Sequence, residues 1–184
     1  MDIGESFIGE GPNAAHISTV IGPRSGPVGT AWAVALATPS LGHTPFVAAL
    51  QPNVPVQPMT LVINKASIIS KWHSEMTWGP AQVGVATGVA DAVMQDIIPK
   101  NDIRALVIVA SIWVSSSAND PEQVFVNNRK AVCKALANGS ARMPSFATVQ
   151  SALKAPHNAF FTASTDQFQR ERDAQKPEAH GSAL

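Results

Sequence analysis

Residues Ala14–Pro27 read AAHISTVIGPRSGP, and this stretch decides how the first part of the chain folds. β-Branched residues give way to glycines and prolines, which predicts a strand over Ala14–Ile21 that runs into a tight loop. Successive strand residues point to opposite faces, so His16 and Ser18 share a face. An imidazole suits proton transfer near neutral pH, but a histidine bonded to a backbone carbonyl is the commoner case. The stretch alone leaves both roles open.

The remaining elements predict an α/β (α+β) fold with one mixed β-sheet and helices packed on one face. The continuous apolar run Leu106–Val114 suits a strand at the centre of a sheet. Pro80–Ile97 has apolar residues at helical spacing and predicts a long helix that covers the sheet. Gly84 and Gly88 are unfavourable inside that helix, so we expect another backbone to approach it closely there. Further predicted elements are strands at Ile3–Gly9, Phe46–Leu50 and Thr60–Ile69, and helices at Val28–Ala37, Ser70–Met76 and Glu122–Ala137. The turn Glu10–Asn13 predicts that Ile3–Gly9 and Ala14–Ile21 form a hairpin.

The composition is that of a globular protein of one domain or one domain with a tail. The chain has 184 residues, of which 45% are hydrophobic and 14% charged, and its formal net charge is zero. The neutral balance argues against a nucleic-acid partner, and the low charged share suggests a surface covered in an oligomer. We expect no membrane span, no secretory signal and no metal site, because none of these patterns appears. The lone Cys133 fits a reducing, cytoplasmic location.

Several separated motifs occur in one order along the chain. They are GEGPNAAHISTVIGPRSGP at 9–27, QPNVP at 51–55, TLVINK at 60–65 and WGPAQVGVA at 78–86. Together they resemble the formaldehyde-activating enzyme family, without a gap from Gly9 to Pro99 and more weakly to about Phe161. Ordered motifs of this kind are far more specific than any single one. We therefore expect residues 1–161 to form a domain of this family and 162–184 to form a polar, flexible C-terminal tail.

The resemblance implies a function as well as a fold. Members condense formaldehyde with tetrahydromethanopterin to methylene-tetrahydromethanopterin and water, a hydro-lyase reaction of one-carbon metabolism, methylotrophy and formaldehyde detoxification. It implies a ribosomal protein S5 domain 2-like fold and a cytoplasmic homopentamer with sites between neighbouring subunits. The expected partners are the small molecules formaldehyde and a reduced pterin, the latter as co-substrate, and no metal is expected.

The resemblance also assigns site residues. His16 matches the catalytic histidine, which would act as acid and base. The residues that match substrate-binding positions are Ser18, Val47, Lys65, Ser67 and Gln82. Lys65 would contact the pterin, Ser67 keeps a hydroxyl where the family usually has threonine, and Gln82 offers an amide donor and acceptor. We expect Lys65 and Ser67 to share one face of their strand.

Ser18 departs from the family pattern, which has aspartate at this position. Serine keeps a short polar group but loses the charge, and hydrogen bonds to charged groups are the stronger kind. The sequence therefore leaves two hypotheses open. One is an active condensing enzyme, and the other is a non-catalytic relative that binds a pterin or a small carbonyl compound as a carrier or sensor.

Overall fold

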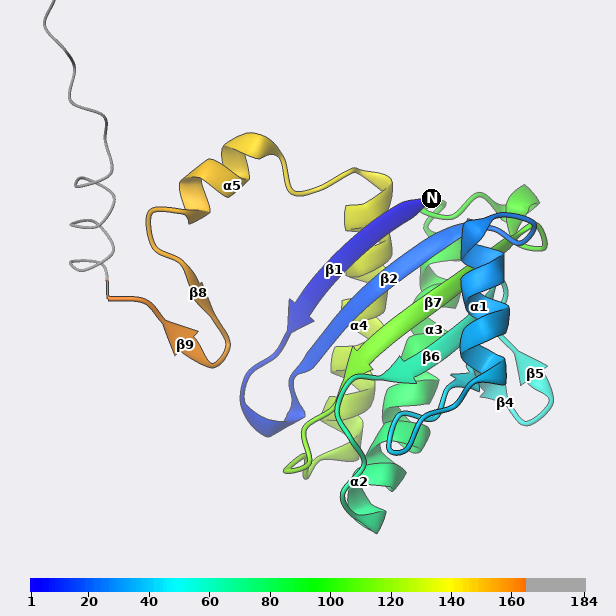
Figure 1. The fold of residues 1–184 in the computed structure, drawn as a ribbon, viewed down its shortest axis with the longest axis horizontal. Coiled ribbons are helices and arrows are strands. Elements are labelled where there is room, and N and C mark those ends of the chain that lie inside the picture. The colour runs from blue at the N-terminus through cyan, green and yellow to red at the C-terminus, as the bar shows by residue number, and fades with distance from the viewer. Residues whose placement is uncertain (165–184) are drawn as a thin grey trace, which may run out of the picture. The chain divides into compact units, whose positions relative to one another are not determined.

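The computed structural model describes residues 1–164, and the chain divides into two compact units at Met143/Pro144. The first, here called the core unit, contains a five-stranded sheet in the order β1-β2-β7-β6-β3 (Figure 1). Because β7 runs parallel to β6 and antiparallel to β2, the sheet is mixed, as the sequence predicts. The strands are β1 Asp2–Ile8, β2 Ala15–Pro23, β3 Phe46–Val47, β6 Met59–Asn64 and β7 Leu106–Trp113.

The predicted hairpin and the predicted central strand are both present. β1 and β2 pair antiparallel across a short 3-10 turn, η1 Gly11–Asn13, and β7 lies between β2 and β6. Burial alternates along the first part of β2: Ala15 and Ile17 are buried, whereas His16 and Ser18 are only partly so. This alternation gives the sheet one core face and one more open face.

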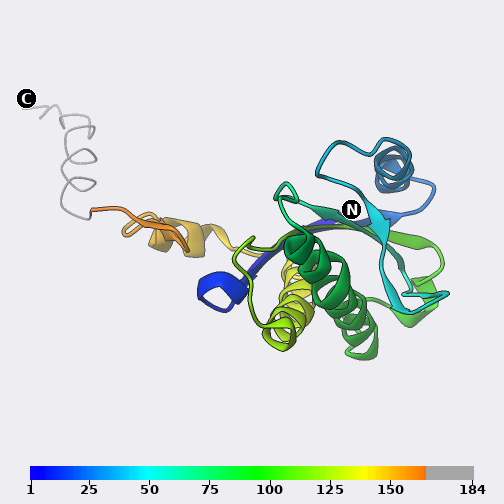
Figure 2. The ribbon, with the colours of Figure 1, turned by 90° about the horizontal axis from the view of Figure 1, so that it is seen from below.

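Two long helices cover the core face. They are α3 Gln82–Met94 and α4 Pro121–Ser140, which lie side by side under the sheet (Figure 2). A Cβ on Gly84 would lie 2.6 Å from the Phe125 carbonyl oxygen, and a Cβ on Gly88 would overlap the Arg129 carbonyl. The expected close approach of another backbone is therefore confirmed, and that backbone belongs to α4.

Helix α1, Pro27–Ala37, is the exception to the expectation that the helices pack on one face. It contacts β2 and β7 from the side opposite α3 and α4 (Figures 1 and 2). The loop after β2 turns the chain back so that Val28 lies over Gly22, and a Cβ on Gly22 would come within 2.7 Å of that side chain. The helix thus covers the Gly22 end of the open face, while His16 lies toward the other end of β2.

Three predicted boundaries shift for local reasons. The strand predicted over Thr60–Ile69 ends at Asn64, whose side chain donates to the carbonyls of Gly42 and Ala66 and turns the chain. The predicted strand Phe46–Leu50 is split into β3 and β4. Pro80 lies in a π turn ahead of α3. The remaining elements of the core unit are β4 Ala49–Gln51, β5 Val54–Pro55, α2 Lys71–Met76, η2 Thr77–Ala81 and η3 Lys100–Asp102.

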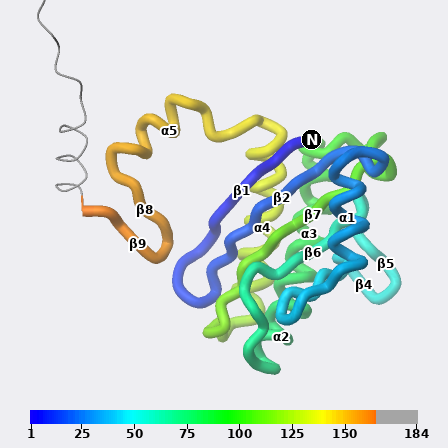
Figure 3. The backbone as a smooth tube through the Cα atoms, in the orientation of Figure 1, coloured from blue at the N-terminus to red at the C-terminus, as the bar shows by residue number. Residues whose placement is uncertain are grey.

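The second unit begins at Pro144 and is described to Ser164. It holds a short helix, α5 Phe146–Ala152, and a hairpin of β8 His157–Asn158 with β9 Phe161–Thr162, all traced in Figure 3. Ser145 caps α5 by accepting a hydrogen bond from the Thr148 amide. Residues 165–184, most of the predicted tail, lie outside the described residues, so the predicted boundary at 161/162 stays a prediction.

The contact between α3 and α4 generates a stability prediction. We expect Gly84→Ala to destabilise the fold by about 1–2 kcal/mol, because overpacking against a backbone carbonyl outweighs the better helix propensity of alanine. The melting temperature should fall by roughly 2–8 °C. Gly79→Ala is the matched control, since a Cβ there meets nothing within 4 Å. A Gly84→Ala variant as stable as the parent in thermal unfolding would refute the tight contact.

Candidate functional site

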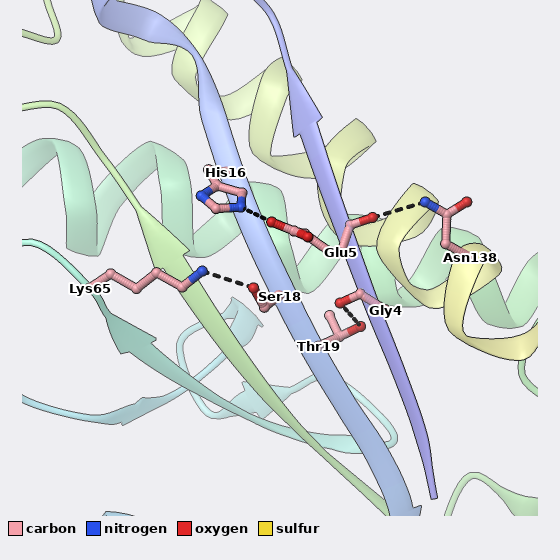
Figure 4. A network of polar contacts seen from close by, with 7 residues as sticks. All are labelled: Gly4, Glu5, His16, Ser18, Thr19, Lys65 and Asn138. Atoms are coloured by element: carbon pink, nitrogen blue, oxygen red, sulfur yellow. Dashed lines mark hydrogen bonds and ion pairs between the residues drawn. The ribbon is translucent and has the colours of Figure 1, made fainter. Parts of the chain in front are cut away.

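Four polar side chains gather on the open face of the sheet. They come from three segments and are Glu5 on β1, His16 and Ser18 on β2, and Lys65, which follows β6 and reaches Ser18 across β7 (Figure 4). The β1–β2 register places Glu5 opposite Ser18 and Phe7 opposite His16. We call these four residues the polar cluster. Their proximity follows from strand pairing, because residues directly opposite each other in a sheet share a face.

His16 is paired with a carboxylate. Its Nε2 contacts Oε1 of Glu5, and a carboxylate oxygen can only accept, so Nε2 carries a hydrogen. Nδ1 is then the ring nitrogen that could exchange a proton with a bound molecule. The His16 side chain is 34% exposed, which leaves it within reach of such a molecule. The Phe7 ring lies 6.1 Å from the imidazole, centroid to centroid, and gives this end of the site an apolar wall.

Glu5 is the member of the polar cluster that the motifs did not identify. The sequence contains a hint of this contact, because a hairpin of the two predicted strands places side chains of β1 beside those of β2 on the same face of the sheet. The exact register decides which β1 residue lies beside the histidine, and only the structure supplies it. Glu5 gives the imidazole a negative partner even though Ser18 is neutral.

Ser18 and Lys65 form the second pair of the polar cluster. Lys65 Nζ donates to Ser18 Oγ over 2.8 Å, so the serine oxygen is the acceptor and its own hydrogen can point to another group. Burial disfavours the charged ammonium and holds the pKa of Lys65 below its usual value, while the negative charge of Glu5 acts in the opposite direction. The negative charge of Glu5 therefore offsets only part of the cost of burying the Lys65 ammonium group.

The expectation that Lys65 and Ser67 share one face of a strand is wrong, because the strand ends at Asn64, before both residues. The two side chains have different partners: Lys65 reaches Ser18, and Ser67 Oγ lies 3.1 Å from Nε2 of His43. The strand ends there because the Asn64 side chain is bonded to two backbone carbonyls.

Val47 and Gln82 lie apart from the polar cluster. Val47 is on β3, three strands from β2, which is about 14 Å at the usual strand spacing. Gln82 begins α3 on the other side of the sheet, where its Nε2 donates to the Ala49 carbonyl over 3.2 Å. A hollow of about 390 Å³ opens beside it, lined by Thr44, Phe46, Trp78 and Gln82. The core unit thus unites His16, Ser18 and Lys65, but not all of the predicted site.

The described part of the chain lacks two kinds of feature. Within residues 1–164, no three or more His, Cys, Asp or Glu side chains are grouped so that they could hold a metal ion. Over the same residues, no helix is both long enough and apolar enough to cross a membrane.

The Ser18–Lys65 contact predicts how a carboxylate at position 18 would act. Ser18→Asp should raise the pKa of Lys65, because a negative charge at hydrogen-bond distance favours the ammonium form. Ser18→Asn, which has the same shape without the charge, is the control and should leave that pKa near its parent value. NMR titration of the lysine side chain measures both. Equal pKa values in the two variants would mean that residue 18 does not face the ammonium group.

Comparison with known proteins identifies the family of the chain. The family model described as formaldehyde-activating enzyme (Fae) matches residues 3–161. The 5,6,7,8-tetrahydromethanopterin hydro-lyase of Methanosarcina barkeri is 38% identical over 151 residues, which are 82% of this chain and 83% of that protein.

Longer relatives match as well. The bifunctional enzyme Fae/Hps of Methanosphaera stadtmanae is 38% identical over 144 residues, 78% of this chain and 36% of that protein. The enzyme of the same name in Archaeoglobus fulgidus is 37% identical over 147 residues, 80% of this chain and 37% of that protein. The chain therefore spans little more than a third of the bifunctional relatives. With a match over nearly its whole described length, the chain belongs to the formaldehyde-activating enzyme family.

Proposed function

We propose that this protein condenses formaldehyde with tetrahydromethanopterin to give methylene-tetrahydromethanopterin and water. The observation that carries the proposal is the carboxylate-paired histidine, His16 with Glu5, on an open sheet face beside Lys65. The hydro-lyase relative supports it, since the similarity covers most of both chains. We place the protein in one-carbon metabolism and formaldehyde detoxification on the same grounds.

The reaction demands a group that both takes and gives a proton. A ring nitrogen of the pterin adds to formaldehyde, water is lost from the adduct, and a second nitrogen closes the new ring. In our proposal Nδ1 of His16 takes the proton of the first nitrogen and passes it to the oxygen of the adduct, which becomes a hydroxyl group. The protonated imidazole then gives a second proton, taken from solvent, to this hydroxyl group, which leaves as water. The proton that the second nitrogen loses on ring closure returns to solvent through the same imidazole, so the protons balance. Glu5 holds Nε2–H, which fixes the ring orientation and stabilises the imidazolium between the two steps. One histidine can therefore serve all these proton transfers.

Lys65 and Ser18 would hold the pterin beside the histidine. The Lys65 ammonium can donate to a pterin oxygen, and the Ser18 hydroxyl retains a hydrogen for a second contact. Since burial already costs the Lys65 ammonium part of its hydration, a ligand acceptor at this position gains a stronger hydrogen bond than an exposed lysine would provide.

The scattered positions of Val47 and Gln82 support a site shared between subunits. Both lie at or beyond the β3 edge, away from the polar cluster. A neighbouring copy that presents this edge to His16 would complete the site, in agreement with the homopentamer that the family resemblance implies. The pentamer and the cytoplasmic location stay predictions.

A carrier or sensor remains the second candidate, because Ser18 lacks the charge of the family aspartate. The presence of Glu5 weighs against it, since the histidine has a carboxylate partner without residue 18. A binding protein has no need of an imidazole oriented for proton exchange.

Substitution of His16 tests the catalytic role. We expect His16→Ala to lower the rate above the spontaneous condensation by about 10²–10⁴-fold, the usual contribution of a general acid–base. Lys71→Met is the control and should keep the parent rate, because that side chain is 90% exposed and its ion pair, with Glu75, involves no residue of the polar cluster. A parent protein that does not exceed the spontaneous rate would favour the carrier or sensor. An active His16→Ala variant would remove His16 from the mechanism.

Subunit mixing tests the shared site. His16→Ala and Gln82→Ala subunits should each be inactive alone, whereas a co-expressed mixture should recover about a quarter of the sites, those whose two contributors are both intact. Light scattering on the same samples measures the assembly. A stable monomer, or a mixture as inactive as its components, would show that the site is not shared in this way.

A further inference from the structure

A histidine that the family resemblance does not assign lies against one of the predicted substrate residues. His43 sits in the loop before β3, and its Nε2 is 3.1 Å from Ser67 Oγ. Its other ring nitrogen, Nδ1, is 2.9 Å from the backbone carbonyl oxygen of Asn64. Carbonyl, imidazole and hydroxyl therefore form a linear chain of hydrogen bonds at the end of β6.

The chemistry of the partners fixes the direction of these bonds. A carbonyl oxygen only accepts, so Nδ1 of His43 must carry the hydrogen. In the neutral imidazole Nε2 then has a bare lone pair, and the Ser67 hydroxyl must donate to it. Since a hydroxyl has a single hydrogen, Ser67 is left with lone pairs only. It can still accept hydrogen bonds but cannot donate another.

The surroundings hold this pair in place. The buried Asn64 side chain donates to the Gly42 carbonyl over 2.8 Å and to the Ala66 carbonyl over 2.6 Å, which ties the two loops together. Gly42 has a left-handed backbone with φ of 75°, and a Cβ there would lie 3.2 Å from Ser67 Cβ. The close approach thus requires glycine.

The pair also lies near the proposed pterin site. Ser67 follows Lys65 by two residues, so their backbones are within about 7 Å of each other. Lys65 points to Ser18 and the polar cluster, and the Ser67 side chain is exposed. A ligand held by Lys65 would therefore extend toward a hydroxyl whose hydrogen is already used.

We propose that His43 is a positioning residue that turns Ser67 into a pure hydrogen-bond acceptor for an N–H group of the reduced pterin. The proposal rests on the proposed function and adds a specificity rule to it. Ligands with an N–H at this position are favoured over ligands of the same shape with a bare nitrogen. A bare nitrogen and the Ser67 oxygen would both be acceptors, and two acceptors cannot form a hydrogen bond. His43 itself need not touch the ligand.

A double-mutant cycle on ligand binding tests the proposal. In the parent, His43→Phe should raise both the Kd and the KM for tetrahydromethanopterin about three- to tenfold, the worth of one neutral hydrogen bond, and leave kcat unchanged. In a Ser67→Ala background the same substitution should have no further effect. His43→Gln should restore part of the affinity, because its amide oxygen can accept from Ser67. Equal effects of His43→Phe in both backgrounds would overturn the proposal, as would a change in kcat alone.

NMR of the free protein provides a readout that does not depend on turnover. The ¹⁵N shifts of His43 should show a protonated Nδ1 and a bare Nε2, and Ser67→Ala should move the Nε2 signal. The opposite tautomer would overturn the proposal. If the protein proves inactive while calorimetry gives the expected cycle in Kd, the proposed catalysis fails and the role of His43 stands. A protein that binds no pterin contradicts both.

Discussion

The alternation of side chains along β2 is the constraint on which the rest of the structure depends. Ala15 and Ile17 are fully buried against the helices, so the strand cannot shift by one residue without exposing them. Such a slip would also carry His16 and Ser18 into the apolar core, where an imidazole and a hydroxyl would lose their partners. The hydrophobic core therefore fixes the functional face as firmly as any contact within the site.

The two faces of the sheet differ in polarity and in exposure because different helices cover them. On the core face, α3 and α4 approach so closely that Gly84 and Gly88 have no room for a side chain. This contact helps to fill that face with apolar residues. On the open face, α1 covers only one end of the strands, and the polar cluster occupies the other. The polar cluster is open to a ligand because α1 does not extend over that end of the strands.

Two polar residues that were not predicted as site residues, Glu5 and Asn64, determine how the predicted ones are arranged. Glu5 gives His16 a carboxylate partner from the neighbouring strand, so the neutral Ser18 is free to pair with Lys65. Asn64 ends β6 before Lys65 and Ser67, whose side chains then bond to different partners, Ser18 and His43. The result is two adjoining polar centres in place of one row of side chains along a strand. Each depends on a contact between segments distant in the sequence.

The sequence by itself determined the hairpin, the central strand Leu106–Trp113, the long helix α3 and the alternation that puts His16 and Ser18 on one face. These features follow from local periodicity, from turn residues and from packing that glycine spacing reveals. Only the tertiary structure decided that α1 crosses the open face, that Glu5 pairs with His16 and that His43 meets Ser67. Such contacts depend on strand register and on loop closure, and neither is encoded in the pattern of a single segment.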